Sequence, residues 1–268
     1  MESKGIVFND SKVYYRVIGN GKPVVLLHGF AEDSAIWDDL IGSKEFPTNY
    51  SVILPDIPGS GRSQLLAGTD ISIGTYAECL KAILDKESIT ECTLIGHSMG
   101  GYISLAFAEK YGSMLNRLGL FHSSAFADDE EKKASRRKAI EFIKDKGPLA
   151  FLKTSLPGLF TDGFKQQHPE VVEALIERGK AFTGEALIQY YNAMINRPDT
   201  TEVLKTFPHP ILFIIGEKDI AIPFEASLKQ CHLPKISDVN ILSDVGHMGM
   251  LEETDKCAGF ITAFLNRP

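Results

Sequence analysis

The feature that most constrains the fold is a series of short, mostly apolar runs spread along the chain. Each run has four or five residues and lacks the strict alternation of a strand with one face in water. Runs of this kind, buried on both faces, are typical of strands inside a parallel sheet. Six of them are present, at Val24–Leu27, Ser51–Leu54, Cys92–Ile95, Leu118–Phe121, Ile211–Ile215 and Val239–Leu242.

Segments with apolar residues at helical spacing lie between these runs. Strands that alternate with helices predict an α/β fold, in which crossover helices connect parallel strands. An alternating segment, Lys12–Val17, predicts one further strand, and Gly19-Asn20-Gly21 after it predicts a turn. The predicted helices are Tyr76–Leu84, Tyr102–Tyr111, Phe224–Cys231 and Cys257–Leu265.

The stretch from about Ala125 to Thr206 breaks this rhythm because it contains no strand-like run. It is too long for a structureless loop in a compact domain, so it predicts several helices. Four acids at 128–131 precede the bases at 132–138, an order that favours a helix with a solvated charged face. We therefore expect a helical cap at residues 125–205, inserted into a core formed by residues 1–124 and 206–268.

Composition narrows the class of protein. Of the 268 residues, 44% are hydrophobic and 24% charged, and the net charge is −7, so disorder and nucleic-acid binding are both disfavoured. The chain shows neither a signal peptide nor an apolar run long enough to cross a membrane. The four cysteines lack metal-site spacing and fit free thiols. We expect a cytoplasmic protein with no nucleic-acid or membrane partner, and its oligomeric state stays open.

The segment Gly96-His97-Ser98-Met99-Gly100 matches the pattern G-x-S-x-G. The pattern alone has limited specificity, but here it follows a strand run and opens a predicted helix. That setting is the one that a nucleophile elbow requires, with glycines where the turn is too tight for side chains. Ser98 is therefore the candidate nucleophile. The alternative is a serine that only caps a helix.

A serine hydroxyl needs a base, and the base needs an orienting acid. His247 lies after the last strand run and before the last helix, and Asp219 follows the run that ends at Ile215. The order serine, acid, histidine is that of a nucleophile-elbow hydrolase. Glu217 and Asp244 are weaker candidates for the acid.

An oxyanion hole needs two backbone N–H donors. Met99, directly after the nucleophile, would supply one. Phe30 would supply the other, because His28-Gly29-Phe30 follows the early run Val24–Leu27 and Gly29 allows a close turn there.

Five segments together resemble the α/β-hydrolase fold superfamily, and they span nearly the whole chain. They are HGF at His28, DIPGSGRS at Asp56, GHSMGG at Gly96, GEKD at Gly216 and GHMGMLEE at Gly246.

The resemblance implies an eight-stranded, mostly parallel sheet with helices on both faces and a helical cap inserted after the sixth strand. It implies the same roles for Ser98, Asp219, His247, Phe30 and Met99. Serine at the nucleophile position excludes the haloalkane dehalogenases and epoxide hydrolases, which use aspartate. The DIPGSGRS loop resembles a signature that is structural in most members.

Further residues are candidates for substrate contact. Core packing is the favoured interpretation of Trp37, and a structural hydrogen bond that of His28. No cofactor is implied, and no pair of histidines has metal-ligand spacing. The substrate-contact candidates are His28, Gly29, Trp37, His122, Ile222 and Met248.

The leading hypothesis is a carboxylesterase-like enzyme (EC 3.1.1) that cleaves esters of small or medium acyl size through an acyl-enzyme. The same triad serves carbon–carbon bond hydrolases, lactonases, thioesterases, amidases and perhydrolases, and hydroxynitrile lyases are also open. The alternative to an enzyme is a receptor that binds a small molecule with little turnover. A further hypothesis is that the charge run at 128–138 binds a protein partner, and the run itself is its only support.

Overall fold

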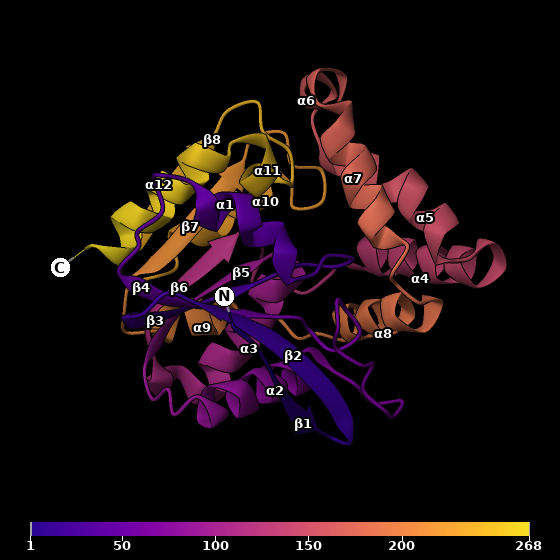
Figure 1. Cartoon of the computed structure of the whole chain (residues 1–268). Helices are drawn as coiled ribbons and strands as arrows, with labels where there is room; N and C mark the ends of the chain where they lie inside the picture. Colours follow the sequence, from indigo (N-terminus) through magenta and orange to yellow (C-terminus); the bar gives the residue numbers. More distant parts are fainter. Residues whose placement is uncertain (1, 268) are drawn as a thin grey trace.

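All six apolar runs form strands of one eight-stranded sheet in the computed structural model, which describes residues 2–267 (Figure 1). The strand order is β1-β2-β4-β3-β5-β6-β7-β8, and neighbours from β4 to β8 are parallel. The strands are β1 Glu2–Phe8, β2 Ser11–Ile18, β3 Lys22–Leu27, β4 Tyr50–Pro55, β5 Cys92–His97, β6 Leu115–Phe121, β7 Ile211–Gly216 and β8 Ser237–Leu242. The central strands β5 and β7 are buried along their whole length, as their apolar composition predicts.

The N-terminal strands differ from the parallel pattern. No strand is predicted before Lys12, yet Glu2–Phe8 forms β1, an antiparallel edge strand paired with β2. An edge strand carries polar residues and leaves much of its surface in water, which explains its weak sequence signal. The turn at Gly19-Asn20-Gly21 leads from β2 to β3, but β2 pairs with β4 instead, also antiparallel.

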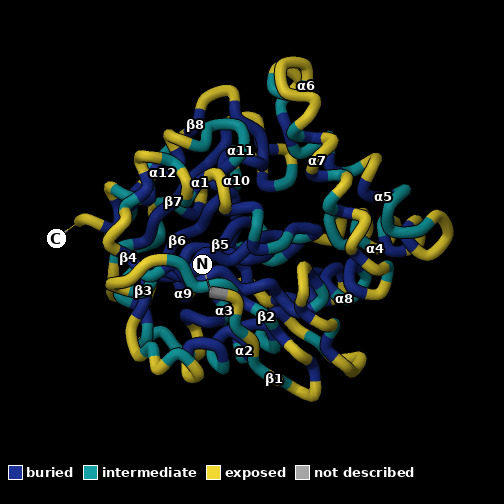
Figure 2. The backbone as a smooth tube through the Cα atoms, in the orientation of Figure 1, coloured by how far each residue is buried: buried dark blue, intermediate teal, exposed yellow. Residues whose placement is uncertain are grey.

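Helices cover both faces of the sheet (Figure 1). On one face α1, α11 and α12 pack together, and on the other α2 packs against α3, which also contacts α9. Figure 2 shows the buried backbone concentrated in the sheet between these layers. The helices of the sheet domain are α1 Asp38–Gly42, α2 Ile73–Lys86, α3 Met99–Tyr111, α9 Thr201–Thr206, α10 Phe224–Cys231, α11 Gly249–Glu252 and α12 Thr254–Leu265.

The long stretch between β6 and β7 is helical, and Figure 1 shows its helices gathered on one side of the sheet domain (right). We call residues 130–195 the helical segment. Its helices are α4 Glu130–Lys146, α5 Pro148–Ser155, α6 Asp162–Gln167, α7 Pro169–Gly179 and α8 Gly184–Ile195. The division of the chain into two domains at residues 125 and 205 stays a prediction.

The charge run on α4 has two sides. Arg137 and Lys138 are exposed, as a solvated face predicts, but Lys132 and Arg136 are half-buried and turn toward the sheet domain. The expectation of a wholly solvated face is wrong for these two residues, because they follow one another at i,i+4 on the inner side of the helix. No helix within residues 2–267 is long and apolar enough to cross a membrane.

Candidate active site

Ser98 lies at the sharp corner between β5 and α3, with φ 50° and ψ −116°. A non-glycine residue at positive φ is strained and persists only where the surrounding structure holds it. The Ser98 N–H donates to the carbonyl oxygen of Phe121 at 2.9 Å, and the Ser123 hydroxyl donates to the Ser98 carbonyl oxygen at 2.7 Å. The end of β6 and the segment that follows it therefore fix the corner on both sides of Ser98.

Two glycines make this corner possible. A Cβ on Gly96 would lie 2.2 Å from the Gly100 carbonyl oxygen, and a Cβ on Gly100 would lie 2.5 Å from the carbonyl oxygens of Leu27 and His28. Backbone atoms cannot move aside as a flexible side chain can. The glycines of the motif are therefore required by close approach of the backbone on both sides of the serine.

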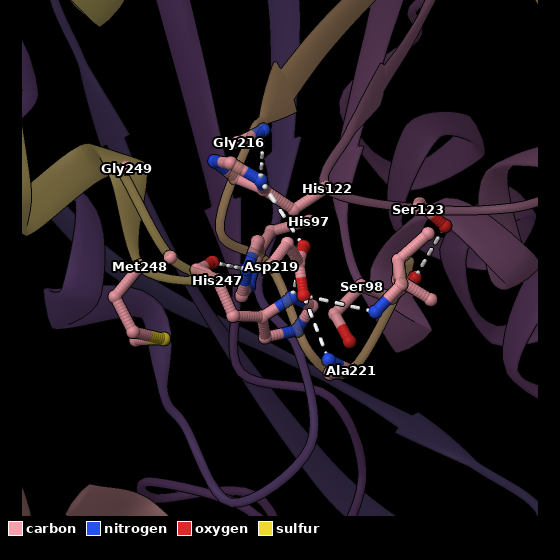
Figure 3. Close-up of polar contacts among 12 residues, drawn as sticks. His97, Ser98, His122, Ser123, Gly216, Asp219, Ala221, His247, Met248 and Gly249 are labelled. Atoms are coloured by element: carbon pink, nitrogen blue, oxygen red, sulfur yellow. Dashed lines mark hydrogen bonds and ion pairs between the residues drawn. The ribbon is translucent and has the colours of Figure 1, made fainter. Parts of the chain in front are cut away.

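His247 and Asp219 are joined by a hydrogen bond, with 2.8 Å between His247 Nδ1 and Asp219 Oδ2 (Figure 3). The second carboxylate oxygen of Asp219 accepts from the backbone N–H groups of Ala221 and Ile222 at 2.8 and 2.9 Å. Burial alone would raise the pKa of Asp219, but the charge of His247 and its hydrogen bond to the carboxylate lower it overall. Asp219 is therefore an ionised acceptor that holds the Nδ1 proton of His247, which leaves Nε2 free to act as a base.

His122 is a second histidine beside this carboxylate, with its Nδ1 3.3 Å from Asp219 Oδ2. The Gly216 N–H donates to the same nitrogen at 3.1 Å, so Nδ1 is an acceptor and the ring proton is on Nε2. Burial lowers the pKa of His122 to about 4, more than the attraction of Asp219 raises it. His122 is thus a neutral packing partner. The grouping of His122, Asp219 and His247 within 4.8 Å is explained by these contacts.

Two backbone N–H groups near Ser98 have no acceptor. Met99 begins α3, so its N–H lacks an intrahelical partner, and the Phe30 N–H lies in the loop after β3. Neither donates a hydrogen bond within the described part of the chain. Both could therefore donate to a group in the cavity, and their role as an oxyanion hole stays a prediction.

A charged pair lies beneath this loop and was not anticipated. His97 Nδ1 is 3.0 Å from Glu32 Oε1, and Glu32 Oε2 accepts from the Gly29 N–H at 2.7 Å. Burial opposes the charged form of both groups, but their mutual attraction and hydrogen bond outweigh it, so the pKa of Glu32 is lowered and that of His97 raised. The only feature of the sequence that indicates this pair is the acid Glu32, three residues after Gly29.

Glu252 holds the loop that carries His247. Its Oε1 accepts from the N–H groups of Gly246 and Met248 at 3.0 and 3.3 Å, and its Oε2 accepts from the N–H and hydroxyl of Thr161 at 3.1 Å each. The N–H of His247 donates to the carbonyl oxygen of Leu159 at 2.7 Å. The histidine loop is therefore bonded to residues of the helical segment, and not only to the sheet domain.

Ser98 and His247 line one cavity of about 350 Å³ between the carboxyl edge of the sheet and the helical segment. Apolar side chains form most of its wall, and Lys132 and Arg136 of α4 are its cations. The volume fits a small-molecule ligand. The lining is Phe30, Glu32, Ser98, Tyr102, Lys132, Ser135, Arg136, Ser155, Leu156, Leu159, Tyr191, Met194, Ile220, Ala221, Ile222, Pro223 and His247.

Among the six substrate-contact candidates, only Ile222 lines this cavity. His28 is buried, and its Nε2 accepts from the Ile57 N–H at 2.9 Å, the structural role favoured for it. Trp37 is fully buried and packs edge-on against Phe121, in agreement with core packing.

The other candidates also lie outside the cavity lining. The Gly29 N–H donates a hydrogen bond to the Glu32 carboxylate, and the His122 ring packs against Asp219 outside the cavity lining. Met248 is fully buried, and Figure 3 shows its side chain directed away from Ser98. Position next to a catalytic residue does not place a side chain in the cavity, since neighbouring residues point in different directions.

Comparisons with known proteins agree with this fold. A family model described as the alpha/beta hydrolase fold matches residues 22–120. The structure of a thermophilic esterase from Thermogutta terrifontis with malate bound is similar at a TM-score of 0.91, with 27% sequence identity over 99% of this chain and 98% of that one. The enol-lactonase from Burkholderia xenovorans LB400 is similar at a TM-score of 0.90, with 20% identity over 98% and 100%.

A relative named for another activity was also found by sequence. The 2-hydroxy-6-oxo-2,4-heptadienoate hydrolase of Pseudomonas putida is 25% identical over 261 residues, covering 92% of this chain and 90% of the relative. Together with the family model and the sheet topology, these likenesses show that the chain has the α/β-hydrolase fold.

Proposed function

We propose that this protein is a serine hydrolase that cleaves carboxylic esters of small or medium acyl size. The observation that carries the proposal is the joint arrangement of Ser98 at a strained corner, His247 bonded to Asp219 at 2.8 Å, and a shared cavity for the serine and the histidine. The esterase of Thermogutta terrifontis, at 27% identity over nearly the full chain, supports the ester as the bond that is cleaved.

The reaction follows from these groups. Ser98 Oγ attacks the ester carbonyl carbon and gives its proton to His247 Nε2, while Asp219 stabilises the imidazolium. The negative oxygen of the tetrahedral intermediate accepts hydrogen bonds from the N–H groups of Phe30 and Met99. The intermediate expels the alcohol, which takes the proton from His247, and leaves an acyl group on Ser98. A water molecule, deprotonated by His247, then attacks the acyl carbon. The second tetrahedral intermediate expels Ser98 Oγ, which takes the proton back from His247, and the acid is released.

Hydrolysis of p-nitrophenyl esters of increasing acyl length, beside the Ser98→Ala variant, tests the proposal. We expect the parent to cleave short esters and the variant to lose activity by at least about 10³-fold, since the nucleophile is removed. A parent that is inactive on every ester would contradict the esterase assignment. Full activity in Ser98→Ala would show that the nucleophile is another residue.

Carbon–carbon bond hydrolysis is the second candidate, because the Pseudomonas putida dienoate hydrolase is 25% identical over 92% of this chain. Turnover of 2-hydroxy-6-oxo-2,4-heptadienoate, followed by loss of its visible absorbance, separates the two functions. A kcat/KM above that for the best ester would favour the carbon–carbon hydrolase.

A further inference from the structure

Cationic side chains gather where α4 meets the cavity. Arg136 and Arg197 share one carboxylate: Arg136 Nε lies 2.6 Å from Asp128 Oδ2, and Arg197 Nη1 lies 2.8 Å from Asp128 Oδ1. Asp128 is buried and can balance only one of the two guanidinium groups. One positive charge of this cluster is therefore left uncompensated beside the cavity.

Lys132 adds a second uncompensated charge one helical turn before Arg136. Its ammonium donates to the carbonyl oxygen of Ala221 at 2.8 Å, and it forms no ion pair with any carboxylate of residues 2–267. An ammonium has three donors, so two remain for other partners. A half-buried cation without a counter-charge is unfavourable unless a polar or anionic group meets it.

The hydroxyl of Tyr102 belongs to the same corner. Tyr102 lines the cavity, and its hydroxyl has no hydrogen-bond partner within the described chain. Burial would raise the pKa of this phenol, but the charges of Arg197, Lys132 and Arg136 lower it overall. Lys132 and Arg136 line the same cavity as Tyr102. Arg197 itself stacks on the Tyr102 ring, 3.9 Å from its centroid.

The rest of the cavity lining has no free carboxylate that could balance the charges of Lys132 and Arg136. Glu32 is the one carboxylate in the lining, and its oxygens are used by His97 Nδ1 and the Gly29 N–H. The other walls are mostly apolar. An anion that enters the cavity could therefore accept hydrogen bonds from Lys132 and Tyr102, which line the same cavity as Ser98.

We propose that Lys132, Arg136 and Tyr102 form an anion-binding subsite that selects esters carrying a free carboxylate. This rests on the proposed ester hydrolysis at Ser98. The carboxylate would accept hydrogen bonds from Lys132 Nζ and the Tyr102 hydroxyl, with the guanidinium of Arg136 adjacent. Bound in this way, the substrate presents its ester to Ser98, and hydrolysis of a dicarboxylic half-ester leaves a dicarboxylate as product.

The kinetic test uses pairs of esters that differ in one charge. Monomethyl succinate, glutarate and adipate are compared with the corresponding methyl ester amides, in which a neutral amide of the same shape replaces the carboxylate. A second series, 3-acetoxypropionate and 4-acetoxybutyrate against their amides, places the carboxylate on the alcohol side. We expect the parent to prefer the anionic member of at least one series by about 10- to 100-fold in kcat/KM.

Lys132→Met removes the free charge and keeps the length of the side chain. We expect it to lower the preference for the anionic ester, measured as the ratio of kcat/KM for the ester acid to kcat/KM for its ester amide, by about tenfold or more. Lys138→Met is the matched control, since Lys138 is an exposed lysine of the same helix without a cavity contact. It should retain the full preference.

Equal preference in the parent and in Lys132→Met would overturn the subsite while the ester hydrolysis itself stands. A parent that prefers the neutral amides would also overturn it. If the parent cleaves no ester, binding of glutarate to the Ser98→Ala variant, measured by calorimetry, decides the question separately. Glutarate binding that weakens about tenfold or more with Lys132→Met supports the subsite, and unchanged or absent binding rejects it.

Discussion

The Nε2 atom of His97 lies 3.0 Å from the main-chain carbonyl oxygen of His247, so the residue before Ser98 is bonded to the backbone of His247. Its other ring nitrogen faces the Glu32 carboxylate at 3.0 Å. Both neighbours are acceptors, so both ring nitrogens must donate, and His97 is an imidazolium. The Glu32–His97 pair therefore joins the oxyanion loop, the elbow and the histidine loop in one buried network.

Glu32→Gln tests this ion pair through the pH dependence of stability. The raised pKa of His97 gives stability that is complete below 6.5 and is lost as pH rises through its folded-state pKa. The lowered pKa of Glu32 gives stability that is complete above 4.5 and is lost as pH falls through its folded-state pKa. Urea unfolding should therefore show the largest difference between parent and variant, about 2 kcal/mol, between these two values.

The control for this experiment is Glu225→Gln, an exposed glutamate. It should change the free energy of unfolding by less than about 0.5 kcal/mol at each pH. A parent–Glu32→Gln difference that stays constant from pH 4 to pH 9 would contradict the ion pair.

Asp219→Asn should lower kcat for the best ester by about 10³- to 10⁴-fold at neutral pH, because an amide cannot hold His247 in the required tautomer as a carboxylate does. The two other acids near this loop provide matched controls. Glu217→Gln and Asp244→Asn, both at exposed positions, should keep kcat within about twofold. A larger loss in either control than in Asp219→Asn would move the orienting role to that acid.

Glu252→Gln should disturb the histidine loop without touching the substrate. The amide NH₂ of glutamine would face either the Thr161 donors or the Gly246 and Met248 donors, so one pair of hydrogen bonds is lost. We expect a loss of about 1–3 kcal/mol in the free energy of unfolding and a lower kcat with KM nearly unchanged. Glu253→Gln, which removes only a surface ion pair with Lys256, should alter neither.

Glycine positions should separate into two groups. Gly259 lies within α12 with open space around its would-be Cβ, so Gly259→Ala should raise the free energy of unfolding by about 0.5–1 kcal/mol. Gly100→Ala would force a methyl group against the backbone of β3 and the following loop, and should lower it by about 3 kcal/mol or more. Thermal denaturation checks both, and a stable Gly100→Ala would argue against the tight corner.

The strands that the sequence predicts best are those buried on both faces. β5 and β7 are continuous apolar runs because both of their faces are buried. β1 is an edge strand that contains Lys4 and Gly5, and it lacks such a run. The positions of Ser98, Asp219 and His247 follow from their places after successive strands, since the carboxyl ends of parallel strands share one edge.

The lining of the cavity was harder to predict because it depends on side-chain direction and on how the helical segment sits. Trp37 and Met248 are close in sequence to predicted site residues and yet point into the core. Lys132 and Arg136 belong to a charge run whose composition indicates solvent, and only their spacing on α4 distinguishes them from Arg137 and Lys138. Glu32 is identified only when the fold brings it to His97.

The hydrogen bond from the His247 N–H to the Leu159 carbonyl oxygen has a mechanical consequence. It joins the helical segment to the loop that carries His247, so we expect the two to move together. A displacement of Leu159 and Thr161 wide enough to admit a bulky ester would also pull the imidazole from its alignment with Asp219. We therefore expect the position of the helical segment and the alignment of His247 with Asp219 to change together when a bulky ligand enters.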